Sequence, residues 1–131
     1  TVLRAATARA IVAAGLHPSL GLHHKSGGDA LSLADDLMEP FRPAVDLLAH
    51  AMRAESITTL EPAHKRRMAA VLHADYDTDD GVTTLSNALA RLAQSLAQVY
   101  LGQRLRLLLP RSAIPLAAGI GPAREHGEDG A

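Results

Sequence analysis

The sequence predicts an all-α fold, a compact multi-helix domain, and three observations support this prediction. Hydrophobic residues make up 47% of the 131 residues but aromatic residues only 2%, so the core must consist mainly of aliphatic side chains. Leu and Ala, which are abundant here, favour helices. Apolar residues also recur at spacings of three and four along most of the chain, which indicates helices with one packed face. The length is usual for a single domain.

The first helix is expected over residues 1–14, and Gly15 should end it because glycine tolerates the left-handed conformation that closes many helices. The apolar residues available for its packing are Val2, Ala5, Ala6, Ala10 and Val12. A second helix is predicted over residues 31–38 from apolar positions at spacings of three and four. Pro40 should kink or end that helix, because proline has no backbone N–H to donate.

Two further helices are predicted from prolines in their first turns. One begins near Pro43, and another begins near Pro62 with Thr59 as its N-cap. The segment DYDTDDG, residues 75–81, is predicted to be a turn or loop.

The longest helix is predicted over residues 81–105. Its apolar seam repeats at spacings of four and three and is expected to pack inside this chain rather than against a partner. The seam consists of Leu85, Leu89, Leu92, Leu96 and Val99. Pro110 and Pro115 then favour an extended arm. Residues 1–116 are therefore expected to form one helical domain, followed by a Gly-rich, charged and disordered tail over residues 117–131.

Composition excludes several classes of protein. The net charge of −1 gives no overall attraction to nucleic acid, and the absence of cysteine excludes disulfides and thiolate metal sites. No apolar run is long enough to span a bilayer, and Arg4 and Arg9 interrupt the first apolar stretch, unlike a secretory signal. We therefore expect a cytoplasmic protein with no membrane partner.

The polar residues gather between Gly21 and Pro40. Asp36 and Glu39 are three residues apart and should share a helix face, while Asp35 could also reach Glu39 at a spacing of four. A histidine nitrogen with one or two carboxylate oxygens would suit Mg²⁺ or Mn²⁺, and Zn²⁺ less obviously. Three carboxylates so close together repel one another unless a cation or an arginine neutralises them.

The histidines needed for such a site are His23 and His24, on a glycine-rich loop that can fold back onto the helix. Lys25 and Arg42 lie close enough in sequence to neutralise the acids. A simpler interpretation is that the acids are ordinary first-turn residues and the histidines surface loop residues. Spacing alone does not decide between these interpretations.

The segment GLHPSLGLHHKSGGDALSLADDLMEPFRPAVD, residues 15–46, resembles the metal-binding segment of the CRISPR-associated adaptation integrases, the Cas-one family, and in particular its type II branch. Residues 21–24, GLHH, are similar to the family's Gly-x-x-His element. Residues 36–43, DLMEPFRP, are similar to its Asp-Leu-Met-Glu-x-Phe-Arg-Pro element. A weaker resemblance extends over most of the chain, to about residue 110.

This resemblance implies a function for individual residues. His24 and Glu39 correspond to metal ligands and catalytic residues, and Asp36 to a supporting ligand. DNA contacts are implied for His23, Lys25 and Arg42, the first of which could instead be loop structure.

The family has a further glutamate ligand, on an earlier helix, and an N-terminal β-rich domain. The chain therefore resembles a C-terminal fragment, residues 1–116 being a partial helical catalytic domain that is expected to be inactive alone.

The implied reaction is phosphoryl transfer with Mg²⁺ or Mn²⁺, in which a 3′-hydroxyl of protospacer DNA attacks a phosphodiester at the CRISPR repeat. The implied partners are DNA, a small second adaptation subunit and a second copy of the chain. Cationic residues along the DNA path would be Lys65, Arg66, Arg67, Arg104, Arg106 and Arg111, although solvated helix faces are the simpler interpretation of each. Two other functions stay open: a non-catalytic helical binding or oligomerisation module, and an unrelated metal-dependent hydrolase.

Overall fold

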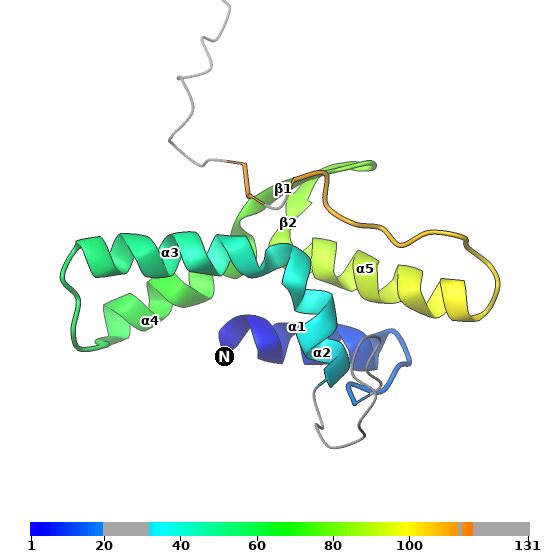
Figure 1. The fold of residues 1–131 in the computed structure, drawn as a ribbon, viewed down its shortest axis with the longest axis horizontal. Helices are drawn as coiled ribbons and strands as arrows, with labels where there is room; N and C mark the ends of the chain where they lie inside the picture. Colours follow the sequence, from blue (N-terminus) through cyan, green and yellow to red (C-terminus); the bar gives the residue numbers. More distant parts are fainter. Residues whose placement is uncertain (20–31, 113, 117–131) are drawn as a thin grey trace, which may run out of the picture.

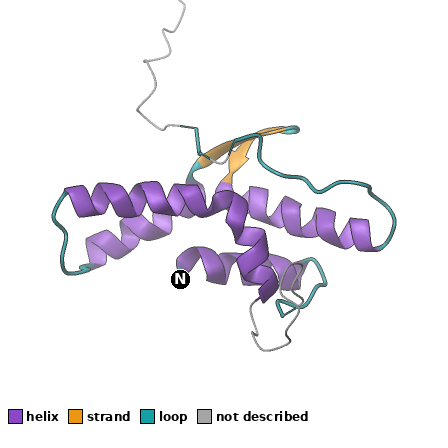
Figure 2. Cartoon of the chain, in the orientation of Figure 1, coloured by secondary structure: helices purple, strands orange, loops and turns teal. Residues whose placement is uncertain are grey.

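The computed structural model describes residues 1–19, 32–112 and 114–116, and it is mainly helical (Figures 1 and 2). The elements are α1 (Val2–Ala13), α2 (Ser32–Met38), the 3₁₀ helix η1 (Glu39–Phe41), α3 (Arg42–Ala54), α4 (Pro62–Ala69), the 3₁₀ helix η2 (Ala70–His73), β1 (Asp75–Thr78), β2 (Gly81–Thr84) and α5 (Leu85–Tyr100). The predicted helical fold class is confirmed. Within these ranges, no helix is both long and apolar enough to cross a membrane.

The helices form two groups with the β-hairpin between them. Figure 1 shows α3 and α4 as antiparallel neighbours at one end, and α1, α2 and α5 at the other. The main core lies where α1 packs on both α2 and α5. The seam of α5 is buried in this core, as predicted, at Leu85, Leu89, Leu92 and Leu96, whereas Val99 is only partly buried. The seam therefore packs inside the chain and does not form a surface for association.

The packed face of α1 differs in part from the predicted one, because Ala6 is the only one of the five predicted packing residues that is buried. Leu3, Thr7 and Ile11 form the buried row at a spacing of four, whereas Val12 is 61% exposed. Thr7 can occupy this row because its hydroxyl donates to the Leu3 carbonyl at 2.8 Å, which satisfies the buried oxygen. A search for apolar periodicity missed the row because its middle member is polar.

Three helices end in the same hydrogen-bonded motif. After α1, the Gly15 N–H donates to Val12 and the Leu16 N–H donates to Ile11, with Gly15 at φ +83°. Gly102 takes the corresponding position after α5, at φ +71°. After α3 the left-handed residue is Ser56, at φ +57°, and its side chain makes this conformation costly. The predicted stop at Gly15 is confirmed.

The predicted cap of α4 is wrong by two residues. Its N-cap is Glu61, not Thr59, and Pro62 takes the first helical position as predicted. The Glu61 side chain accepts from the His64 backbone N–H, the role expected of a threonine, and the His64 ring accepts from the Glu61 N–H at 3.1 Å, which completes a capping box.

Pro40 places a sharp bend between α2 and α3. In a continuous α-helix the residue 40 N–H would donate to the Asp36 carbonyl, and proline has no such group. The chain tightens into η1 at this point and resumes as α3 at Arg42. Phe41 is fully buried under the bend, and its ring meets Tyr76 of β1 edge-on, with centroids 5.3 Å apart at 77°.

The segment predicted as a loop, residues 75–81, forms most of an antiparallel hairpin. Tyr76 pairs with Thr83, and Thr78 pairs with Gly81. Tyr76 and Thr78 are buried on one face while the aspartates between them stay accessible, so the strand alternates despite its high aspartate content. Because these residues are strands, the longest helix begins at Leu85 instead of residue 81 and ends at Tyr100.

The predicted extended arm is confirmed and runs back over the molecule to the hairpin (Figure 1). The Leu108 N–H donates to the hydroxyl of buried Ser95 at 2.9 Å, which holds the arm on α5. Farther on, the Arg111 N–H donates to the Asp77 carbonyl and the Leu116 N–H to the Asp75 carbonyl. The arm thus lies along β1. The tail predicted as disordered, residues 117–131, lies outside the described residues.

We predict that Ser56→Gly stabilises the fold. Glycine adopts the left-handed conformation without the steric cost that serine incurs, so the free energy of unfolding should rise by about 0.5–1 kcal/mol. Thermal and urea unfolding would measure the change. Ser86→Gly, at an exposed position inside α5, is the matched control and should instead lower stability by a similar amount. Equal destabilisation by both variants would contradict the strain at Ser56.

A second prediction concerns Tyr76, whose hydroxyl is buried without a hydrogen-bond partner among the described residues. Burial raises the pKa of Tyr76 from 10.0 to about 12, because the charged phenolate is poorly solvated. The contribution of the neutral Tyr76 phenol to the free energy of unfolding is therefore complete below pH 10. It is lost as the pH rises from 10 towards 12, because this phenol ionises at a lower pH in the unfolded chain than in the folded one. Tyr76→Phe should remove that alkaline loss and raise stability at pH 7 by about 1 kcal/mol.

Urea unfolding of both proteins at pH 7 and between pH 9 and 12 would measure this difference. Tyr100→Phe, at a side chain that is 55% exposed, is the control. This variant should lose stability between pH 10 and 12 as the wild type does. A Tyr76→Phe protein that loses stability in the same alkaline range as the wild type would contradict the assignment.

Candidate functional site

The acidic residues lie on the accessible side of α2. Leu33, Ala34 and Leu37 are buried against the core, which leaves Asp35 and Asp36 on the opposite part of the helix surface. The apolar periodicity of α2 therefore fixes which side of the helix can carry polar chemistry.

Asp35 is held by α1 and does not pair with Glu39. The Arg4 guanidinium donates from Nε to Oδ1 at 2.7 Å and from Nη2 to Oδ2 at 2.8 Å, so both carboxylate oxygens accept. The side chains are 37% and 28% exposed. An arginine does neutralise part of the acidic cluster, as expected, but it comes from α1. Sequence reasoning missed Arg4 because the partners are 31 residues apart and no local spacing connects them.

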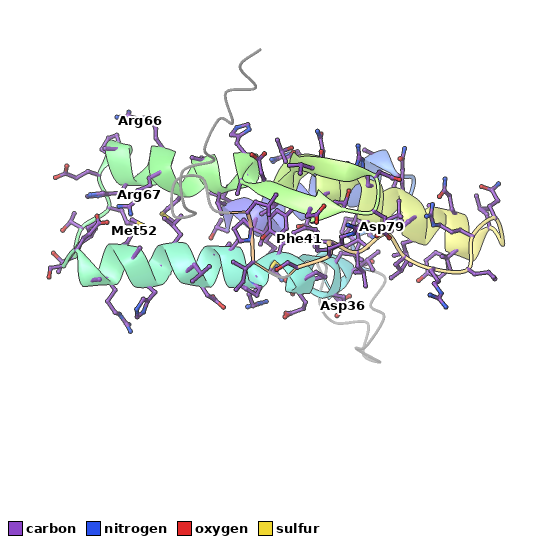
Figure 3. The ribbon with its side chains drawn as sticks, turned by 90° about the horizontal axis from the view of Figure 1, so that it is seen from above. Asp36, Phe41, Met52, Arg66, Arg67 and Asp79 are labelled. Atoms are coloured by element: carbon purple, nitrogen blue, oxygen red, sulfur yellow. The ribbon has the colours of Figure 1, made fainter. Side chains whose placement is uncertain are left out.

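Asp36 and Glu39 occupy the last turn of α2 and the first residue of η1. Their three-residue spacing places them on one face, as predicted. The Glu39 side chain is 59% exposed, and the Arg42 guanidinium lies 2.9 Å from Glu39 Oε1. Figure 3 shows Asp36 at the outer margin of the molecule, whereas Phe41 points into its centre. The two carboxylates are therefore presented outward at the Pro40 bend.

The remaining predicted site residues, His23, His24 and Lys25, lie outside the described residues. The ends of that segment are tied together, since the Leu33 N–H donates to the Pro18 carbonyl and the Ser32 hydroxyl to the Ser19 carbonyl. The chain thus leaves the described part at the N-terminus of α2 and returns there. Within residues 1–19 and 32–116, apart from residue 113, no three histidine, aspartate or glutamate side chains come together in a way that could hold a metal ion.

Arg66, one of the other predicted cationic residues, lies apart from Asp36. Arg66 and Asp36 are at opposite margins of Figure 3. Arg67 pairs with Glu55 at 2.7 Å and joins α4 to the end of α3, and this hydrogen bond lowers the pKa of the Glu55 carboxyl. Arg111 lies between Asp79, at 3.1 Å, and Asp77, at 3.7 Å. Arg67 and Arg111 therefore have structural ion pairs.

Comparison with known proteins identifies the family. Residues 1–78, more than half of the chain, match the family described as CRISPR associated protein Cas1. The chain belongs to the Cas1 family. The matched region runs from α1 to β1 and contains the Asp36–Pro43 element, so the resemblance seen in that motif is confirmed.

One curated Cas1 relative is the CRISPR-associated endonuclease Cas1 of Neisseria meningitidis serogroup C (strain 8013). It is 40% identical over 74 residues, which are 55% of this chain and 24% of the relative. The chain therefore spans about a quarter of the length of this Cas1 protein.

Proposed function

We propose that this chain is the C-terminal catalytic part of a Cas1 endonuclease and integrase that inserts DNA into a CRISPR array. The observation that carries the proposal is the outward pair Asp36 and Glu39, held on one helix face at the Pro40 bend within the region that matches the family. The intact protein would act on protospacer DNA and the CRISPR repeat. It would do so as a homodimer with a small second adaptation subunit.

The donor atoms on this face suit a hard divalent cation. Two carboxylates one helical turn apart provide oxygen ligands, which Mg²⁺ and Mn²⁺ prefer. His24 is five residues from Ser19, so an extended chain of about 17 Å would allow its imidazole to join them. We therefore propose His24 and Glu39 as ligands, Asp36 as a supporting ligand, and a further glutamate from another part of the Cas1 protein. Such an ion supplies positive charge that activates an oxygen nucleophile and stabilises the phosphorane-like transition state.

The residues of the chain have separate tasks in this reaction. Glu39 and Asp36 hold negative charge where the cation binds, and the Pro40 bend keeps both outside the core. Arg42 now balances Glu39, so a cation at Glu39 would leave its guanidinium available for a DNA phosphate. His23 and Lys25 would add contacts to the same backbone, since phosphate neutralisation dominates DNA affinity.

The first test of this function is a Mn²⁺ titration of the chain, followed through the ring protons of its seven histidines by NMR. Paramagnetic broadening should affect His24 selectively, because it alone is proposed as a ligand. Glu39→Gln should remove the effect, and Asp46→Asn, which changes an exposed carboxylate on α3, should not. Equal broadening of all the histidines, or broadening that survives Glu39→Gln, would contradict the proposed site.

Strand transfer by the full-length protein provides an independent prediction. Glu39→Gln and His24→Ala should each lower the rate by about a hundredfold or more, since even outer-shell partners of a metal cost 10–100-fold when removed. A gel assay of oligonucleotide insertion into a repeat would measure the rate, and thermal unfolding would show that the fold is intact. Asp46→Asn is again the control. Wild-type activity in Glu39→Gln would favour the binding-module interpretation instead.

A further inference from the structure

We propose that Arg4 and Asp35 are positioning residues of the metal centre, which set the rotation of α2 about its axis so that Asp36 and Glu39 face the cation. This inference rests on the proposed function, because it concerns the same carboxylates. Neither Arg4 nor Asp35 would touch the metal or the DNA.

The geometry of the Arg4–Asp35 pair fixes the orientation of the Asp35 carboxylate. Arg4 donates through two parallel hydrogen bonds, of 2.7 Å and 2.8 Å, to the two oxygens of Asp35. A planar guanidinium bound in this way fixes the orientation of the carboxylate as well as its distance. The pair also joins α1 to α2, which are neighbours in the core. It therefore transmits the position of α1 to the helix that carries the acids.

The first turn of α2 is held by hydrogen bonds from the Ser32 hydroxyl to Ser19 and from the Leu33 N–H to Pro18, and the rest of the helix is held less specifically. Leu33, Ala34 and Leu37 bury it by hydrophobic contact, which has no directional preference. The helix has seven residues, and a helix this short has little stability of its own. A rotation of about 20° would move a side-chain tip lying about 5–6 Å from the axis by about 2 Å. Metal ligands tolerate only about 0.2 Å.

The pair also distinguishes adjacent carboxylates. Successive residues of an α-helix are about 100° apart, so a rotation by one residue would turn Asp36 towards α1 and Asp35 into the buried direction that Ala34 now occupies. Arg4 stabilises the arrangement in which Asp35 faces α1. Of the three acids in this segment, the ion pair thus commits one to structure and leaves Asp36 and Glu39 on the outward face.

If Arg4 and Asp35 acted only through their charges, substituting each of them would change the cation affinity in a different way than if they position the helix. Removing only Arg4 makes the acidic cluster more negative, which by electrostatics alone should tighten cation binding. Removing only Asp35 makes the cluster less negative and should weaken binding. Loss of a positioning pair should instead weaken binding in both cases. The signs of the two single substitutions therefore separate the two roles.

The experiment measures Mn²⁺ affinity of the full-length protein, from the free Mn²⁺ signal in electron paramagnetic resonance, together with thermal unfolding. We expect Arg4→Gln and Asp35→Asn each to weaken binding by about tenfold, the range found for outer-shell partners. The double variant should be no weaker than the worse single variant, because each single substitution already removes the Arg4–Asp35 interaction. Arg4→Lys keeps the charge but loses the planar fork, so it should bind as poorly as Arg4→Gln.

Two controls make the outcomes decisive. Arg9→Gln removes the same charge from an exposed position on α1 and should leave the affinity unchanged. Tighter binding in Arg4→Gln, or wild-type binding in Arg4→Lys, would overturn the positioning role in favour of charge alone. A lower melting temperature with unchanged affinity would overturn it in favour of structure alone. Binding that survives Glu39→Gln would instead disprove the proposed function, so the two failures are distinguishable.

Discussion

The bend at Pro40, with Phe41 buried beneath it, is the constraint on which the rest of this structure depends. Proline removes the donor that would continue α2, and the contact of Phe41 with Tyr76 seats the bend against the hairpin. On one side of the bend α2 stays on the core with α1 and α5, and on the other α3 leaves to contact η2, with its end joined to α4 by the Arg67–Glu55 ion pair. Asp36 and Glu39 lie directly before the proline, on the accessible side of the bend. The bend therefore places the candidate site at the junction of the two groups of helices.

The sequence predicted the fold wherever local chemistry determines it. Helix stops at Gly15, the kink at Pro40 and the seam of α5 follow from conformational preference and periodicity, and all are observed. The hairpin could not be predicted, because its two strands contain two aspartates and a glycine, and only two buried side chains, Tyr76 and Thr78, mark them as strands. What stabilises it is non-local: Tyr76 packs on Phe41, and the arm covers β1.

The candidate site was predictable to a similar extent. The shared face of Asp36 and Glu39 follows from helical spacing, and the pairing of Arg42 with Glu39 follows from their closeness in sequence. The separation of Asp35 from that pair could not be predicted, since it depends on an arginine from another helix. The metal-binding role of His24 stays a prediction, because that residue lies outside the described part of the chain.

The packing of α1 on α5 has a consequence for how the chain acquires its structure during synthesis. These helices lie at opposite ends of the described sequence, yet they form the two sides of one core. A nascent chain on the ribosome therefore exposes the apolar face of α1 until α5 has emerged from the exit tunnel. Local pairs such as α3 with α4 can form earlier. Polypeptides that stall before α5 has left the tunnel should be the species that chaperones and proteases capture.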